Sequence, residues 1–367
     1  MKTHLAALLR GMFRATERPM TNLIERPAGP PAEITLPRSV EEAVRSFQGK
    51  ARAQSTKDGY RLFWNEFCTW CGRYGRQSLP ASPETVAAWL VSLATGDGRQ
   101  RPLKVASIEK ARSAVLVAHQ AAGHPLAQRE PAIVMAMAGI RREKALTEEV
   151  RRAAPLQAAD ARSILAVSGD GPASLRDAAL LLLMWGGALR ESEAVGLDWQ
   201  RRGSGTGYVL VEERGVQITL LRSKTSQGAA TKIAIPRWDM PEAAGVIARW
   251  QEAAALSPGD PVFRGVNRHQ QISGKRLTAR AVDLIVKRKL CELFVRRGLS
   301  PHDAEALAAR YSGHSLRAGF ATDAALREAP VQKIQEHMRH RSPATTSVYI
   351  RPIEQWRSGT LKKAWQD

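Results

Sequence analysis

The sequence predicts a mainly α-helical protein with a small antiparallel β-sheet, arranged as a helical first domain and an α+β second domain. Apolar residues recur at helical spacing from residue 40 to about residue 140, which predicts an all-helical domain. Three short runs rich in β-branched residues follow, at 208–212, 216–221 and 231–235, separated by turn residues. A length of 367 residues fits two domains of about 150 residues each.

Four helices are expected in the first domain. The first has an apolar face formed by Tyr60, Phe63, Trp64, Phe67 and Cys71. The second begins at Ser82-Pro83-Glu84, where a capping Ser is followed by Pro in the first turn and an acid near the positive end of the helix dipole. The third should run from Ser107 to Ala122 and the fourth from Glu130 to Ala138. In the second domain, helices are expected at 158–167, 174–189, 241–256 and 278–297, and in short pieces after that.

Composition shifts give the expected domain boundaries. Residues 1–39 contain a Pro-rich run and no signal-peptide core, so we expect a flexible leader; a mitochondrial-type presequence and a true start at Met20 are the alternatives. Residues 40–140 form the helical domain, and residues 141–156 are basic and poor in large apolar side chains, which predicts an extended linker. The second domain should cover residues 157–353, followed by a tail at residues 354–367.

The charge balance favours a polyanionic partner. Lys and Arg number 55 against 35 Asp and Glu, a formal net charge of +20, and the sequence pI is near 10.5. Such an excess is typical of nucleic-acid-binding proteins, although charge used only for solubility is the alternative. Residues 268–353 alone hold 16 Lys and Arg against 7 Asp and Glu, so a phosphate-binding surface is expected there.

Other classes of protein are disfavoured. The longest apolar run, Ala178 to Leu189, is too short to span a bilayer. Three cysteines cannot form a disulfide framework, which favours the reducing cytoplasm. Cys68 and Cys71 have CxxC spacing, but both fall on the apolar face of a helix without a second ligand pair, so we expect core packing and no metal site.

Candidate chemical residues gather in the second domain. His314 and Arg317 are spaced i, i+3, which places imidazole and guanidinium on one helical face. Arg190 ends an apolar helix that is broken by glycines, where a helix cap is the simpler reading. Lys224 lies in a turn between two predicted strands and, taken alone, reads as an exposed hairpin lysine. His340 and Tyr349 complete the series.

In this order the residues resemble the tyrosine recombinase (phage integrase) family. The resemblance covers roughly residues 40 to 355 and rests on three boxes and the hairpin lysine: Ala188-Leu-Arg190-Glu-Ser-Glu193, His314-Ser-Leu-Arg317-Ala-Gly-Phe-Ala-Thr322, and His340-Arg-Ser-Pro-Ala-Thr-Thr-Ser-Val-Tyr349. Two positions depart from the pattern, since Ala188 and Arg339 stand where the family usually has Gly.

The chemistry of strand transfer explains these residue types. Without ATP or a metal, the energy of the broken phosphodiester must be kept in a covalent intermediate, so a nucleophilic side chain is needed. Tyr349 fits this role better than Tyr311, which has no counterpart in the family pattern. Arg190 and Arg317 would clamp the phosphate oxygens in the transition state. The remaining roles are a general base or phosphate donor for His314, a general acid for Lys224, a phosphate donor for His340, and orientation of an arginine or of His314 for Glu193.

The resemblance implies a site-specific DNA recombinase with no cofactor. The helical domain would be the core-binding domain and the second the catalytic domain, closing together around double-stranded DNA. Tyr349 would form a 3′-phosphotyrosyl bond, and a homotetramer on DNA, a monomer or weak oligomer when free, would exchange strands through a Holliday junction, with accessory proteins as optional partners. The tail at 354–367 would dock on a neighbouring copy, with packing on its own chain as the alternative. DNA contacts are expected from Arg141, Arg142, Arg151, Arg152, Arg222, Arg339 and Arg341.

Two other functions remain open at this level. One is a DNA-binding accessory protein on the same fold that has lost its chemistry. The other is an enzyme of the type IB topoisomerase kind that relaxes DNA. In each case we expect a protein of the cytoplasm, bound to the bacterial nucleoid when on DNA.

Overall fold

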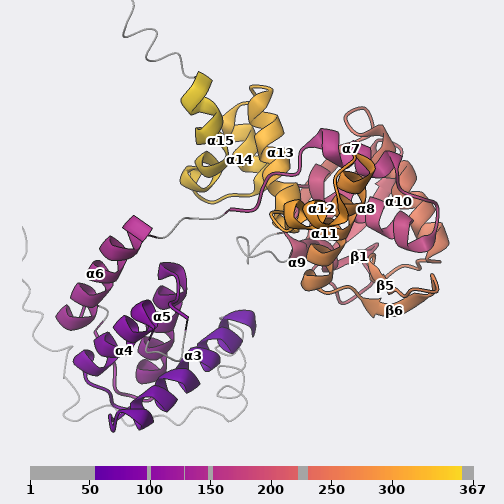
Figure 1. Cartoon of the computed structure of the whole chain (residues 1–367). Helices are drawn as coiled ribbons and strands as arrows, with labels where there is room; N and C mark the ends of the chain where they lie inside the picture. The colour runs from indigo at the N-terminus through magenta and orange to yellow at the C-terminus, as the bar shows by residue number, and fades with distance from the viewer. Residues whose placement is uncertain (1–53, 97–100, 128, 148–151, 222–229, 358–367) are drawn as a thin grey trace, which may run out of the picture. The chain divides into compact units, whose positions relative to one another are not determined.

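The computed structural model describes residues 54–96, 101–127, 129–147, 152–221 and 230–357 (Figure 1). The chain divides into two units, Met1–Glu149 and Val150–Asp367. The expected leader and the last ten residues of the expected tail lie outside the described residues.

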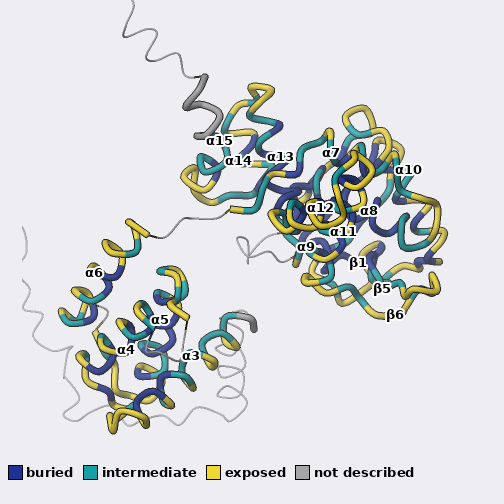
Figure 2. Tube along the Cα trace, in the orientation of Figure 1, coloured by how far each residue is buried: buried dark blue, intermediate teal, exposed yellow. Residues whose placement is uncertain are grey.

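The described part of the first unit is helical. Its helices are α3 (Gln54–Arg73), α4 (Pro83–Thr95), α5 (Val105–Ala121) and α6 (Pro131–Thr147). α4 begins as expected, because the Ser82 hydroxyl accepts a hydrogen bond of 3.2 Å from the backbone N–H of Thr85. In its core, the rings of Phe67 and Trp89 pack with centroids 4.9 Å apart. Figure 2 shows the buried stripe of each helix turned toward this core.

The fourth helix is longer than the sequence indicated. α6 continues through Gly139 to Thr147, so the expectation of an extended linker from residue 141 is wrong for residues 141–147. Ile133, Met137 and Ile140 form one buried stripe, and their packing keeps the chain helical beyond Gly139. After it, Arg141 donates a hydrogen bond of 3.0 Å to Glu109 on α5, which fixes the next turn.

The described residues of the second unit form nine helices and six strands. The elements in chain order are α7 (Ala158–Ala166), α8 (Pro172–Gly186), α9 (Glu191–Val195), β1 (Leu197–Trp199), β2 (Gly207–Glu212), β3 (Gly215–Leu220), β4 (Thr231–Pro236), α10 (Pro241–Ala253), β5 (Arg264–Val266), β6 (Ile272–Arg276), α11 (Ala279–Arg296), α12 (Pro301–Ala308), α13 (His314–Leu326), α14 (Val331–Met338) and α15 (Pro343–Arg357).

The three predicted strands form one sheet with an extra strand. β2, β3 and β4 are antiparallel, with Val209 opposite Ile218 and Ile218 opposite Ile233. β1 adds to the sheet edge parallel to β2, and β5 and β6 form a separate hairpin. β1 and β5 have three residues each, too few to show an alternating pattern, and this is why the sequence did not indicate them.

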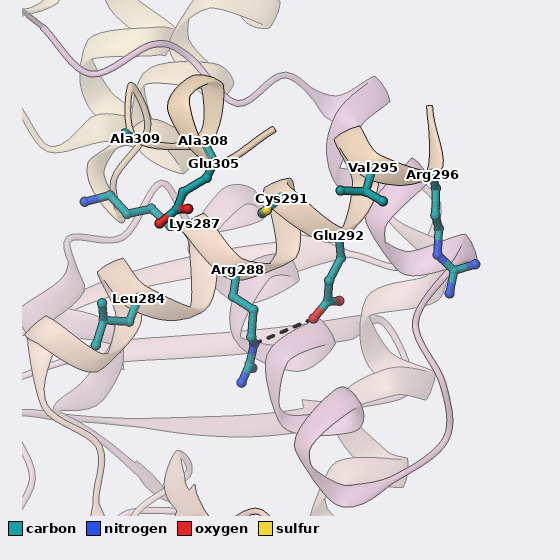
Figure 3. Close-up of a pocket in the computed structure, with 10 residues that line it drawn as sticks. All are labelled: Leu284, Lys287, Arg288, Cys291, Glu292, Val295, Arg296, Glu305, Ala308 and Ala309. Carbon is teal, nitrogen blue, oxygen red and sulfur yellow. Dashed lines mark ion pairs between the residues drawn. The ribbon is translucent and has the colours of Figure 1, made fainter. Parts of the chain in front are cut away.

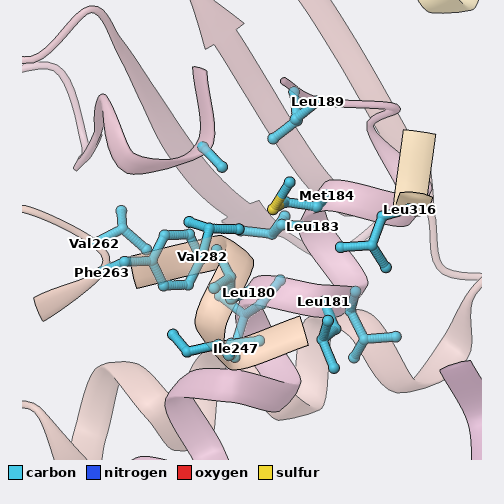
Figure 4. Packing of buried hydrophobic residues seen from close by; sticks show 14 of the residues in the cluster. Leu180, Leu181, Leu183, Met184, Leu189, Ile247, Val262, Phe263, Val282 and Leu316 are labelled. Carbon is cyan, nitrogen blue, oxygen red and sulfur yellow. The ribbon is translucent and has the colours of Figure 1, made fainter. Parts of the chain in front are cut away.

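The main core of the second unit lies around α8. Leu180, Leu183 and Met184 of this helix are buried among side chains of α10, α11 and α13, including Ile247, Val282 and Leu316 (Figure 4). α8 is buried along most of its length, and therefore reads as a continuous apolar run rather than as an amphipathic stripe.

The last residues of the expected linker belong to the second unit. Leu156 is fully buried, its N–H donates to the carbonyl of Ser315 at 2.8 Å, and its own carbonyl accepts from the Trp185 indole at 3.2 Å. Gly319 permits this approach, since a Cβ at position 319 would overlap the Leu156 carbonyl. Asp323 then accepts a hydrogen bond of 2.6 Å from the backbone N–H of Ala158 and so caps α7.

A smaller core joins α13, α14 and α15, which lie together in Figure 1. Ala188, from the connection between α8 and α9, is buried in it beside Ala321, Ile334, Met338 and Ile350. The described segments around Arg190, Arg317, His340 and Tyr349 therefore share one packing centre.

In the part of the chain that the structure describes, we found no helix with the length and apolar character needed to cross a membrane.

Candidate active site

Arg190 and Glu193 form an ion pair at the start of α9. The Arg190 Nη1 lies 2.6 Å from Glu193 Oε1, and the other carboxylate oxygen accepts from the Arg190 backbone N–H at 3.0 Å. The side chain of Arg190 is 18% exposed, whereas that of Glu193 is 3% exposed. Glu193 therefore holds Arg190 from the protein side and leaves part of its guanidinium open to solvent.

Arg317 is buried beneath this pair. It is 1% exposed, and its terminal nitrogens donate to the backbone carbonyls of Ala188 and Met338. Burial, followed by the neighbouring charges of Arg190 and Arg339, lowers the pKa of Arg317 to about 9. Arg317 thus links, by hydrogen bonds, the backbone before Arg190 to the backbone before His340.

His314 and Tyr349 are hydrogen-bonded to each other. The distance from His314 Nε2 to Tyr349 Oη is 2.7 Å, although the two residues are 35 positions apart in sequence. Burial lowers the pKa of His314, and Arg317 and Arg190 act in the same direction. Burial raises the pKa of Tyr349. A neutral imidazole therefore faces a neutral phenol at neutral pH.

His340 is a second histidine beside Tyr349. The two rings are nearly parallel, at 15°, with centroids 6.1 Å apart. His340 Nδ1 is 2.9 Å from the hydroxyl of Thr346, which is fully buried. Burial and the charges of Arg317, Arg190 and Arg339 lower the pKa of His340 to about 4, so this ring is also neutral at neutral pH.

Apart from Arg339, the other predicted catalytic and DNA-contact residues are either outside the described residues or exposed. Lys224, Arg222 and Arg151 lie outside the described residues; the segment that contains Lys224 joins β3 and β4, which pair antiparallel up to Leu220 and Thr231. Arg152 and Arg341 are exposed in the second unit. Arg141 and Arg142 are exposed on α6 of the first unit.

Arg339, which the sequence analysis named as a DNA contact, is largely buried. Its side chain is 7% exposed, and its terminal nitrogens bond to the carbonyls of Gly187, His337 and Ala188 and to Glu193, at 2.7 to 3.1 Å. The guanidinium therefore faces the protein interior, which does not favour a phosphate contact. The sequence could not show this, because three of the four partners, Gly187, Ala188 and Glu193, lie about 150 positions earlier in the chain.

Thr346 is a residue of the site that sequence reasoning missed. It belongs to the third box, but nothing in the spacing indicates that its hydroxyl meets His340 six positions earlier. Only the turn between α14 and α15 brings the two side chains together.

Two further features lie apart from this cluster. Cys71 is in the core of the first unit, where burial raises the pKa of its thiol to about 11. A groove of about 690 Å³ lies between α11 and α12, with Leu284, Cys291 and Val295 among its lining residues (Figure 3). None of the candidate catalytic residues that the structure describes lines this groove.

Comparisons with known proteins agree with this geometry. The family described as "Phage integrase family" matches residues 155–355. An "Integrase/recombinase xerD homolog" from Selenomonas ruminantium is 30% identical over 327 residues, which cover 86% of this chain and 87% of that protein. The chain belongs to the phage integrase family and is an enzyme of the tyrosine recombinase class, which confirms the resemblance found in the sequence.

Solved structures show the same fold. The Tn1549 transposon integrase in complex with transposon right end DNA has a TM-score of 0.55 at 14% identity, over 86% of this chain and 97% of that one. The XerH site-specific recombinase bound to a palindromic difH substrate has a TM-score of 0.51 at 16% identity, over 78% and 73% of the two chains. The prediction of a mainly helical protein with small sheets is confirmed.

Proposed function

We propose that this protein is a site-specific DNA recombinase that cuts and rejoins duplex DNA through a 3′-phosphotyrosyl intermediate at Tyr349, using neither a metal ion nor ATP. The observation that carries the proposal is the 2.7 Å contact between His314 Nε2 and Tyr349 Oη, next to the cationic group of Arg190 and Arg317. The complexes of the Tn1549 integrase and XerH with DNA support duplex DNA as the partner.

In the proposed cleavage step, Tyr349 Oη attacks the scissile phosphorus. The new bond joins the phenol oxygen to phosphorus, and the bond from phosphorus to the 5′-oxygen breaks. His314 Nε2 takes the phenol proton, which its neutral state and the short contact favour. Lys224 gives a proton to the leaving 5′-oxygen. Rejoining is the reverse reaction with a 5′-hydroxyl from the partner strand.

Charge stabilisation falls to the arginines and His340. Arg190 is the more accessible contact for the non-bridging oxygens, and Glu193 keeps it in place. Arg317 is more deeply buried; its terminal nitrogens each donate to one carbonyl, at Ala188 and Met338, and each has a second N–H that can donate to a phosphate oxygen. His340 donates through Nε2 to the same phosphate. The lowered pKa of Arg317 supports an anionic ligand, since a phosphate would relieve the excess of positive charge.

The proposed assembly follows from the family. Residues 40–140 serve as core-binding domain and residues 157–353 as catalytic domain, and the exposed Arg141, Arg142, Arg152 and Arg341 grip DNA phosphates, as do Arg151 and Arg222. Four copies exchange strands through a Holliday junction in the cytoplasm, and residues 354–367 dock on the neighbouring copy. The free protein is a monomer or weak oligomer, with or without accessory proteins.

Covalent trapping tests the proposal. The protein is incubated in EDTA with nicked duplexes that tile the DNA flanking its gene, and adducts are separated on a denaturing gel. We expect an adduct on at least one duplex, lost in Tyr349→Phe and kept in the control Tyr311→Phe. The strand recovered from the adduct identifies the cleaved duplex.

Other outcomes separate the alternatives. If the wild type binds the duplexes but forms no adduct on any of them, the chain is a DNA-binding accessory protein and the proposal is wrong. If it forms the adduct and relaxes supercoils but never joins strands from two sites, it is a topoisomerase of the type IB kind.

A further inference from the structure

Arg339 connects two segments of the candidate active site. It follows the last residue of α14 and immediately precedes His340. From there its guanidinium reaches the connection between α8 and α9, where Nη1 donates to the Gly187 carbonyl at 2.9 Å and Nη2 to the Ala188 carbonyl at 2.8 Å. Ala188 is two residues before Arg190, so the contacts fix the backbone that leads to Arg190.

The same guanidinium also holds the partner of Arg190. Arg339 Nη2 lies 3.1 Å from Glu193 Oε2, while Glu193 Oε1 lies 2.6 Å from Arg190 Nη1. The carboxylate thus bridges two arginines, one with a 7% exposed side chain and one with an 18% exposed side chain. Without Arg339, Glu193 Oε2 would lose its charged partner and keep only the backbone N–H of Arg190, at 3.0 Å, so the carboxylate would be held less firmly against Arg190.

We propose that Arg339 is a positioning residue for Arg190, which it acts on by holding Glu193 and the connection between α8 and α9 in place. The inference rests on the proposed function, since Arg190 is the phosphate contact that is positioned. It replaces the sequence-based role of Arg339 as a direct DNA contact. The terminal nitrogens of this buried guanidinium already bond to three carbonyls and a carboxylate. Few N–H donors are therefore left for a phosphate.

The cleavage rate and the duplex affinity of variants distinguish a positioning role of Arg339 from a direct contact with DNA. The variants are Arg339→Met, Arg339→Lys and the control Arg327→Met, which removes an exposed arginine after α13. Each is tested on the cleaved duplex for the Kd of the duplex and for the single-turnover cleavage rate at saturating protein. For Arg339→Met we expect an unchanged Kd and a rate lowered by about tenfold or more, short of the roughly 10²–10³-fold loss that follows removal of a direct contact. Arg339→Lys should recover part of the rate, and Arg327→Met should match the wild type.

A pH profile distinguishes positioning from general loss of stability. Glu193 is faced by Arg190, Arg317 and Arg339 from α9, α13 and the end of α14, and Arg339 and Arg190 hold its pKa below the usual value against the opposite effect of burial. Removal of Arg339 should raise that pKa, so cleavage by Arg339→Met should decline at a higher pH on the acid side than cleavage by the wild type. A general loss of stability would lower the melting temperature without moving this decline.

A measurement made without DNA tests the role of Arg339 independently of the proposed function. The NMR signal of the Arg190 Nε–H, assigned with Arg190→Lys, should be that of an immobilised group in the wild type and in Arg327→Met, and of a mobile group in Arg339→Met. If no duplex yields an adduct with the wild type, the proposed function fails while this signal still decides the role of Arg339.

Two results would overturn the inference. One is an Arg339→Met variant with weakened duplex binding and a wild-type rate at saturation, which would make Arg339 a DNA contact. The other is an Arg190 signal that stays immobilised in Arg339→Met.

Discussion

The imidazole of His340 can donate to a phosphate only in one tautomer. Its Nδ1 is 2.9 Å from the Thr346 hydroxyl, and its pKa of about 4 keeps the ring neutral at neutral pH. When the hydroxyl donates to Nδ1, the ring proton is on Nε2 and is available to the phosphate. In that arrangement the buried threonine would select the tautomer that the proposed chemistry needs.

Replacement of Thr346 tests this selection. Thr346→Val keeps the shape and removes the donor, so cleavage at saturating protein should slow, by less than the roughly 10²–10³-fold expected when the His340 donor itself is lost. Thr346→Ser should restore most of the rate. Equal rates for Thr346→Val and the wild type, measured in single-turnover cleavage, would show that Thr346 does not set the tautomer.

Two strained residues mark the positions where the sequence departs from its family. Ala188 has φ of +43° and Arg339 has φ of +56°, in the left-handed region where residues other than Gly are disfavoured by about 1–2 kcal/mol. The sequence analysis noted that both positions usually hold Gly, and the backbone now gives the physical reason. At Arg339 the side chain offsets the strain with its bonds to Glu193 and to the α8–α9 connection.

At the scale of single elements, local signals predicted most of the fold. The start of α4 was readable from Ser82 and Pro83, and the strands β2, β3 and β4 from their β-branched runs. Contacts distant in sequence decided the rest. α6 passes Gly139 because Ile140 is buried, and the approach of Leu156 to α13 depends on a glycine that no local pattern explains.

Two glycine substitutions in the second unit measure this close approach. Gly319→Ala should destabilise the unit strongly, since the new Cβ overlaps the Leu156 carbonyl and must displace backbone. Gly245→Ala is the matched control, on the exposed side of α10 with no atom within 4 Å of its Cβ, and should stabilise by about 0.5–1 kcal/mol. Thermal and urea unfolding provide the comparison. A Gly319→Ala protein as stable as Gly245→Ala would mean that Leu156 is not held against α13.

At the scale of the whole molecule, the net charge of +20 has two components. Exposed arginines such as Arg152 and Arg341 are available to DNA phosphates along the duplex. Arg190 and Arg317 instead converge on one site, assembled from the α8–α9 connection, α13 and the α14–α15 connection. The identities of these residues were readable from the boxes in the sequence. The bonds of Arg317 to Ala188 and Met338 were not, because they span 129 and 21 positions along the chain.

Salt dependence separates the two components. Binding of the cleaved duplex should weaken steeply with salt in the wild type, with a slope of roughly −0.9 for each phosphate neutralised. Arg190→Ala should abolish cleavage and keep most of that slope, since it removes one contact of many. Arg341→Ala should reduce the slope by about one unit and affect cleavage at saturating protein less than Arg190→Ala does. If Arg190→Ala instead lost duplex binding in proportion to cleavage, the same arginines would serve both for grip and for catalysis, and the division of charge drawn from their burial would be wrong.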